Sequence, residues 1–241
     1  MWYMIAFLSI TVFISVCVAT VAGFGAGTIL TPILLLFFDQ TQSLIFVGII
    51  HWFADLFKIM LFFKHRSWTL LILFGLPAVI CSFFAALLAI TISKAIFARL
   101  FGSVLLLYVA GNIFLPTFRL APTNMTAICG GALSGFLGGL VGTQGAVRTL
   151  FLSFFNLPKN TYLWLSGAIP LLIDTTRLLT YITWGVALDR TLIIALLFAL
   201  PVAGIASITG KLLVQKISQE KFRKTVDLFL LLMGLYLIIH G

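Results

Sequence analysis

The chain has 241 residues, of which 62% are hydrophobic and only 9% are charged, and its Lys and Arg exceed its Asp and Glu by nine. A soluble domain is about 25% charged, so this composition excludes a water-soluble globule and predicts a polytopic membrane protein in contact with the lipid bilayer. The basic residues fall mostly in short connections, as membrane topology favours, so nucleic acid is not an expected partner.

The first half of the chain begins with an apolar stretch at 2–21, near the length of about 20 residues that a bilayer requires. It has no basic leader and no small-residue cleavage site, so we expect a retained span rather than a signal peptide. A glycine-rich break, GFGAG at 23–27, leads into a short apolar piece at 24–38. Three full-length spans are then predicted, at 43–63, 69–91 and 97–115.

The second half repeats this order. An apolar stretch at 125–141 runs into a second break, GGLVGTQG at 138–145, and a short piece follows at 144–157. Three further spans are predicted at 161–183, 189–210 and 225–239, with the longest polar connection at 211–224. A helix of about 14 residues rises only about 21 Å, so neither short piece is expected to cross the membrane alone.

Matching motifs support an internal duplication. DLFK, from Asp55 to Lys58, and DTTR, from Asp174 to Arg177, lie 119 residues apart. ISKAIFAR and ISQEKFR, and the prolines Pro77 and Pro201, keep an offset of 124 residues. We therefore predict two homologous repeats, at 1–120 and 121–241.

The basic residues indicate how the repeats are oriented. If each broken segment returns to the side on which it began, nine bases lie on one side of the membrane and three on the other, and the repeats are inverted. If each broken segment crosses, the repeats are parallel and the split is eight to four. The positive-inside bias favours inversion, a common plan of secondary transporters. The predicted fold is an all-α polytopic membrane protein with two inverted repeats, each a glycine-broken segment followed by three transmembrane helices.

Five charged side chains lie inside apolar spans, where a charge costs a few kcal/mol or more and needs a partner, water or a function. Asp55 and Lys58 share one helix face at i and i+3, as do Asp174 and Arg177. These four residues form structural ion pairs that let the spans insert, or they belong to a site. Arg148 has no acid in its own segment. It either snorkels to the interface or meets an anion in a water-filled cavity.

The second break holds other groups suited to an anion. Gly142 and Gly145 expose backbone N–H groups, and Thr143 and Gln144 add uncharged donors. The short helix after the break directs its positive dipole end toward the middle of the membrane. The first break has Gly23, Gly25, Gly27 and Thr28 in the corresponding place but no arginine.

His51 lies four residues before Asp55 on the same helical face. It is either a hydrogen-bonded structural histidine or a proton carrier. Cys17, Cys81 and Cys129 are isolated and lack metal-ligand spacing, so we expect neither a metal nor another cofactor.

GFGAGTILTPILLL at 23–36, and the run from GGLVGTQGAVRTLFL to LLIDTTRLLTY within 138–181, resemble the TauE/SafE sulfite exporter family, also called the toluene-sulfonate uptake permease family. The resemblance covers both halves, and its most specific part is GTQG-x-x-R followed by D-x-x-R. It implies a multi-pass transporter of the bacterial inner membrane for small sulfur-containing anions such as sulfite, sulfoacetate or other sulfonates. Phe151 stands where the first half has Pro32, so the two halves are not equivalent in detail.

The resemblance also implies where the anion binds. The expected substrate-binding residues lie in the two breaks and on the two charged helices: Gly25, Gly27, Thr28, Lys58, Gly142, Thr143, Gln144, Gly145, Arg148 and Arg177. The expected residues for proton coupling or charge pairing are His51, Asp55 and Asp174.

The expected function is a secondary carrier for a small sulfur-containing anion, with proton coupling as an option. A passive anion channel and a non-transporting membrane assembly protein are the alternatives, and a homodimer is compatible with each. No nucleophile with a base and no cluster of metal ligands favours an enzyme.

Overall fold

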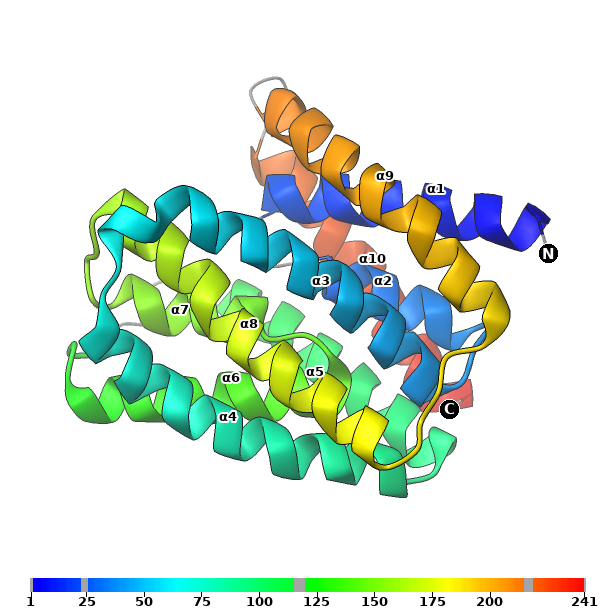
Figure 1. The fold of residues 1–241 in the computed structure, drawn as a ribbon, viewed down its shortest axis with the longest axis horizontal. Helices are drawn as coiled ribbons and strands as arrows, with labels where there is room; N and C mark the ends of the chain where they lie inside the picture. Colours follow the sequence, from blue (N-terminus) through cyan, green and yellow to red (C-terminus); the bar gives the residue numbers. More distant parts are fainter. Residues whose placement is uncertain (1, 23–25, 115–119, 215–218, 241) are drawn as a thin grey trace.

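The computed structural model describes residues 2–22, 26–114, 120–214 and 219–240, and every regular element in them is helical. In chain order the α-helices are α1 Trp2–Ala22, α2 Gly27–Leu35, α3 Gln40–Phe62, α4 Trp68–Thr91, α5 Lys94–Phe114, α6 Asn124–Val141, α7 Gly145–Ser153, α8 Lys159–Thr183, α9 Arg190–Val214 and α10 Gln219–His240. A 3₁₀ turn, η1 Phe63–His65, joins α3 to α4. Figure 1 shows these helices as one bundle.

The helices have the lengths and the outer surface of membrane spans. Six of them, α1, α3, α4, α5, α6 and α9, are long and apolar enough over their described residues to cross a bilayer. Large apolar side chains such as Phe57, Ile72, Phe84 and Leu197 point outward, as expected for a surface in contact with lipid. The helix α8 is equally long, at 25 residues, but its polar side chains Ser166, Asp174, Arg177 and Thr180 are buried against other helices. The fold is that of an all-α, multi-pass membrane protein.

A stripe of glycines on α6 lets this helix lie directly on α4. A Cβ atom at Gly131, Gly135 or Gly139 would overlap the backbone carbonyls of Phe74, Ala78 and Ser82, in that order. Both series advance by four residues, so α4 and α6 run parallel. Small residues at every fourth position bring backbones close together, which is how membrane helices gain packing energy.

Gly135→Ala is therefore expected to lower the free energy of unfolding by about 1–3 kcal/mol, because its new methyl group would overlap the Ala78 backbone. The measurement is the thermal midpoint of the purified protein in detergent. Gly204→Ala on α9 is the matched control, since a Cβ atom there meets nothing within 4 Å. Equal midpoints for the two variants would contradict this close packing of α4 on α6.

The short helix α7 folds back along α6. A Cβ atom at Gly138 would lie 3.4 Å from the Cβ of Gln144, and one at Gly130 would touch Phe151. The chain therefore reverses at Gly142, the residue that ends α6 in the left-handed conformation, with φ of 72°. Because α6 lies beside α4 in register, this reversal falls level with Ala85, six residues before α4 ends at Thr91. Six helical residues span about 9 Å, so the second break lies well inside the bundle.

Helices from the two halves of the chain pack against each other throughout. α4 contacts α6, α1 contacts α9, α3 contacts α8, and α5 contacts α10. Gly48 on α3 lies against Arg177 near the end of α8, while Gly167 on α8 lies against Lys58 near the end of α3, so these two helices run antiparallel (Figure 1). The antiparallel pair is compatible with inverted repeats, and the inversion of the two halves in the membrane stays a prediction.

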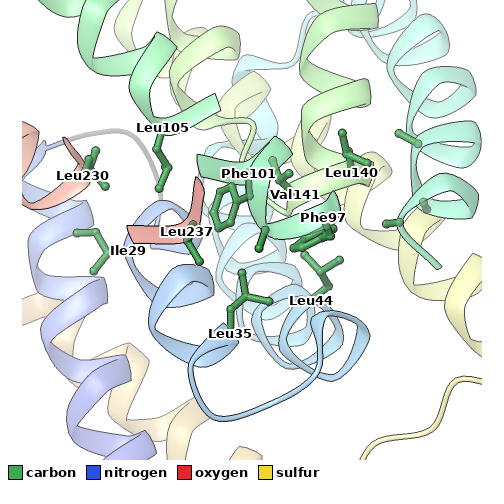
Figure 2. Close-up of a cluster of buried hydrophobic side chains, with 14 of the residues drawn as sticks. Ile29, Leu35, Leu44, Phe97, Phe101, Leu105, Leu140, Val141, Leu230 and Leu237 are labelled. Carbon is green, nitrogen blue, oxygen red and sulfur yellow. The ribbon is translucent and has the colours of Figure 1, made fainter. Parts of the chain in front are cut away.

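One of two equally large clusters of buried apolar side chains joins the two halves of the chain (Figure 2). Phe97 and Phe101 of α5 are completely buried, and they lie among side chains from α2, α3, α6 and α10. Leu140 and Val141, the last two residues of α6, belong to this cluster. The cluster therefore holds the end of α6, and with it the second break, against the helices of the first half.

Several predicted boundaries were wrong. The short helices have nine residues each rather than about 14. The first ends at Leu35, and the second ends at Ser153, shortly before a turn at Asn156, whose φ is 45°. The connection at 211–224 is also mostly helical, since α9 continues to Val214 and α10 begins at Gln219.

The basic residues lead to a prediction about topology. Both termini are expected outside the cell and the segment 211–224 in the cytoplasm, because this segment carries five of the basic residues. The test replaces the three native cysteines and places single cysteines at either end or near residue 216. An impermeant thiol reagent added to intact cells should label the ends and spare the segment. A cytoplasmic N-terminus with an external C-terminus would contradict inversion, because such a chain crosses the membrane an odd number of times.

Candidate functional site

The two glycine breaks are in direct contact at the centre of the bundle. The hydroxyl oxygens of Thr28 and Thr143 lie 2.6 Å apart and share a hydrogen bond. A Cβ atom at Gly27 would lie 2.6 Å from the carbonyl oxygen of Gly142, so only glycine fits there. Each threonine sits at or beside the N-terminus of a short helix, α2 or α7. Both positive helix ends therefore converge on one point, which we call the junction.

Gly25, together with Gly23, lies outside the described residues. The other residues predicted in the breaks are described, and Gly27, Thr28, Gly142, Gln144 and Gly145 are buried while Thr143 is partly exposed. The side-chain oxygen of Gln144 is buried and has no hydrogen-bond partner.

Both predicted ion pairs form, with the same geometry but in different surroundings. The Lys58 ammonium donates to Asp55 over 2.8 Å, and the Arg177 Nε donates to Asp174 over 2.8 Å. The side chains of Arg177 and Asp174 are 0% and 1% exposed, whereas those of Lys58 and Asp55 are 38% and 10% exposed. The equivalent pairs of the two halves thus differ, one sealed in the core and one open on the side of the lysine.

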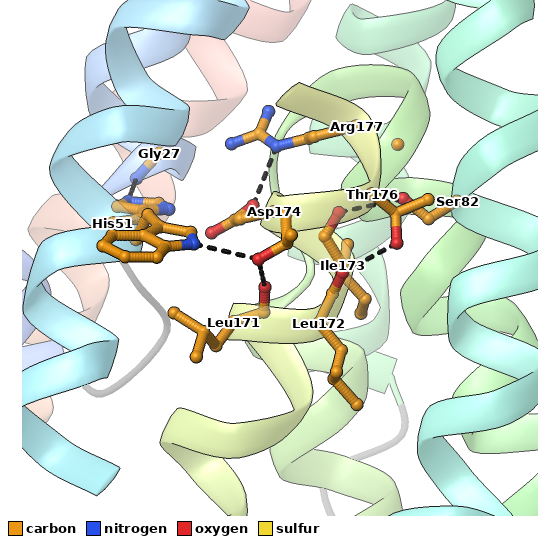
Figure 3. A network of polar contacts seen from close by, with 12 residues as sticks. Gly27, His51, Ser82, Leu171, Leu172, Ile173, Asp174, Thr176 and Arg177 are labelled. Atoms are coloured by element: carbon orange, nitrogen blue, oxygen red, sulfur yellow. Dashed lines mark hydrogen bonds and ion pairs between the residues drawn. The ribbon is translucent and has the colours of Figure 1, made fainter. Parts of the chain in front are cut away.

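Arg177 uses only one edge of its guanidinium group for this ion pair (Figure 3). Its Nη1 and Nη2 nitrogens are buried and have no hydrogen-bond partner, and neither has the Oδ2 oxygen of Asp174. A Cβ atom at Gly142 would lie 2.8 Å from Nη1, and one at Gly48 would lie 3.0 Å from Nη2. The group is therefore held between α3 and the second break. A buried donor without a partner costs about 1–3 kcal/mol or more if charged, so these nitrogens suit an incoming acceptor.

Arg148 is the second cation at this place. It lies in the first turn of α7, its residue is 8% exposed, and its Nε is buried without a hydrogen-bond partner. No described acid forms an ion pair with it. A Cβ atom at Gly138 would lie 2.6 Å from the Cγ2 of Ile173 on α8 and 3.4 Å from the Cβ of Gln144. The sequence indicated a base without its own counter-charge, and the structure places the start of the helix that carries it close to the part of α8 that holds the buried ion pair.

His51 links α3 to the start of α2. The Gly27 backbone N–H donates to the Nε2 of His51 over 3.0 Å (Figure 3). An imidazole that accepts at Nε2 is neutral and carries its proton on Nδ1. The hydrogen bond matches the structural role that we considered for this histidine, and it places the ring at the junction.

Sequence reasoning missed two residues of this region. Thr31 on α2 is fully buried, its hydroxyl has no partner, and that oxygen lies near Gly142. Gly48 makes room for the Arg177 guanidinium, and Gly167 occupies the equivalent place on α8. The second omission was avoidable, because these glycines keep the 119-residue offset of the charged motifs.

The junction therefore combines two buried guanidinium groups, one bonded carboxylate and two helix N-termini. The cations outnumber the anions there, and hydroxyls from both halves are close by. Such a set of donors fits a small anion with several oxygens, because planar guanidinium groups donate pairs of hydrogen bonds to oxyanions. A separate shallow groove on the outer face of α3 and α8 is lined by apolar side chains and Thr175, and it includes none of the predicted site residues.

Comparison with known proteins agrees with this picture. A family profile described as "Sulfite exporter TauE/SafE" matches residues 7–237, nearly the full length of the chain. No curated protein and no solved structure matched the chain. Since the profile spans both halves, including both breaks and both ion pairs, the chain belongs to the sulfite exporter TauE/SafE family.

Proposed function

We propose that the chain is a secondary transporter of the bacterial inner membrane that exports a small sulfur-containing anion. Sulfite and organosulfonates such as sulfoacetate are the substrate class, and the anion binds at the junction between the two halves. Membership of the sulfite exporter family supports this class of substrate.

One observation carries the proposed site. Three guanidinium nitrogens are buried without partners: Nη1 and Nη2 of Arg177, which lie against the second break and α3, and Nε of Arg148, in the first turn of the helix that follows this break. A pyramidal or tetrahedral sulfur oxyanion offers three oxygens, which can accept from both groups at once. Each hydrogen bond between charged groups contributes about 1.5–3 kcal/mol, enough to compensate for the loss of water around the anion.

The backbone adds donors on the same side. The Arg148 N–H makes the first hydrogen bond within α7, to the Gln144 carbonyl, so the N–H groups of Gly145, Ala146 and Val147 precede the helical ladder. The first N–H groups of a helix lack partners within it and favour a negative charge. In this proposal they face the anion together with the Thr143 hydroxyl.

The membrane potential favours export. A negative interior drives an anion outward with about 2.3 kcal/mol per charge for every 100 mV. Release on the far side requires that the junction open, and such opening would separate the Thr28–Thr143 hydrogen bond and the close contact of Gly27 with Gly142.

The test reconstitutes the purified chain into vesicles and measures uptake of radiolabelled sulfite, sulfoacetate, methanesulfonate, acetate and chloride. We expect saturable uptake of at least one sulfur anion and little uptake of acetate or chloride. Unlabelled sulfite loaded inside should accelerate entry of labelled sulfite, which a carrier does and a passive channel does not. Uptake equal to that of empty vesicles for all the sulfur anions would contradict the proposal.

A further inference from the structure

The imidazole of His51 accepts a hydrogen bond from a backbone N–H group that could otherwise donate to an anion at the junction. Its Nε2 accepts from the Gly27 N–H at the first residue of α2. A Cβ atom at Gly27 would lie 2.9 Å from the Cε1 of His51 and 2.6 Å from the Gly142 carbonyl oxygen. The ring and the second break therefore flank the same glycine. His51 therefore lies next to the place between the breaks where an anion would bind.

The charges around this ring are mostly positive. Lys58 follows His51 by two turns on α3, and the Arg177 guanidinium lies against Gly48, about one turn before His51. Burial and nearby positive charges both oppose a positive charge on an imidazole, and an anion bound beside the ring would offset the part that comes from the charges. The charged groups near His51 are Asp55 and Lys58 on its own helix, Asp174 and Arg177 on α8, and Arg148 on α7, while α2 has no charged residue.

Only one half of the chain has this histidine. The residue 119 positions later, which matches His51 as Asp174 matches Asp55, is Pro170 inside α8. Conversely, the short helix α7 after the second break has Arg148, and the corresponding helix of the first half, α2, has no arginine. The two halves therefore supply different groups to the junction, a titratable ring from the first and a permanent cation from the second.

We propose that His51 carries a proton that moves together with the anion. This inference rests on the proposed function and adds the coupled ion to it. When an anion enters the junction, a proton from water binds to Nε2 of His51, and the hydrogen bond from the Gly27 N–H breaks. The imidazolium and the released N–H both become donors that face the anion. Release of the anion returns the proton to water and restores the hydrogen bond.

The reverse effect follows from linkage. If the anion favours protonation of His51, protonation strengthens binding of the anion by the same factor, commonly about 5–150-fold in coupled sites. Each sulfite then crosses the membrane together with one proton. The net negative charge that is transported with each anion is therefore smaller by one. Proline at position 170 cannot act in this way because it has no titratable group.

The experiment compares the full-length parent with His51→Gln in vesicles that contain a pH-sensitive dye. Glutamine is the matched substitution, because its amide oxygen can accept from the Gly27 N–H but does not titrate. Radiolabelled sulfite is added outside, and proton entry and sulfite entry are recorded together, with the signal of empty vesicles subtracted. His65→Gln is the control, since His65 is exposed in η1 and hydrogen bonds to Asn160.

We expect the ratio of protons to sulfite ions that enter to be higher by about one in the parent and in His65→Gln than in His51→Gln. His51→Asn, a second variant that does not titrate, should match His51→Gln, and both should elute as the parent does. Equal proton-to-sulfite ratios in all four proteins would overturn the inference, because any proton would then travel on the sulfite itself. An absence of sulfite entry in the parent would instead contradict the proposed function, and the inference with it.

Discussion

Arg148→Ala is expected to reduce saturable sulfite transport by about two to four orders of magnitude while the protein still folds. The variant removes a permanent charge and at least two hydrogen bonds to the anion, each worth about 1.5–3 kcal/mol. Folding should survive because no described acid is paired with Arg148, so its removal leaves no buried charge without a partner. The measurements are initial rates of sulfite uptake into vesicles over a range of concentrations, together with the elution profile in detergent.

Two further variants make this result specific. Arg148→Lys keeps the charge but loses the planar fork, so it should weaken binding and retain part of the transport. Arg66→Ala removes an exposed arginine beyond η1 and should transport like the parent. If Arg148→Ala also moves sulfite like the parent, Arg148 extends to the membrane surface and the anion binds elsewhere.

Asp174→Asn is expected to have the largest effect on folding of any substitution in the two charged motifs. It leaves Arg177, whose side chain is 0% exposed, without its counter-charge. Removing one partner of a buried ion pair costs about 3–5 kcal/mol. We therefore expect little folded protein, measured as the yield that elutes as a single species after extraction in detergent.

Asp55→Asn provides the matched comparison at the equivalent position of the first half. Lys58 is 38% exposed and can be solvated, so this variant should fold better than Asp174→Asn. Exchanging the charges of the second pair, as Asp174→Arg with Arg177→Asp, tests for a role beyond folding. If the exchanged pair folds and transports at the parental rate, the pair is purely structural.

Local sequence was sufficient to predict the helices and the two ion pairs. Apolar length and glycine content indicated the order of full and broken helices, because the bilayer restricts both. The Asp-x-x-base spacing predicted two contacts along one helix face, and both ion pairs form at 2.8 Å. These features depend on residues within one or two helical turns of each other.

The surroundings of the two pairs could not be read from the motifs. Asp55–Lys58 and Asp174–Arg177 have the same spacing, but only the second is sealed, because Gly48 and Gly142 bring α3 and the second break onto its guanidinium group. The hydrogen bond between Thr28 and Thr143 joins residues 115 positions apart, and no local pattern specifies it. Such contacts depend on how complete helices pack.

Arg148 combines a feature that local sequence reveals with one that only the packing of the helices determines. Its lack of an acidic neighbour is visible in the sequence and raised the question of a ligand. Its position close to α8 depends on the reversal of the chain at Gly142, which turns α7 back along α6.

Equilibrium binding of radiolabelled sulfite to the purified chain tests the central claim most directly, because it requires neither a membrane nor a direction of transport. The assay compares the parent, Arg148→Ala, Arg177→Lys and the control Arg66→Ala. We predict one saturable site per chain in the parent and in Arg66→Ala, about tenfold or more weaker binding in Arg177→Lys, and no saturable binding in Arg148→Ala. Parental affinity in both Arg148→Ala and Arg177→Lys would contradict a sulfur anion site at the junction of the two breaks.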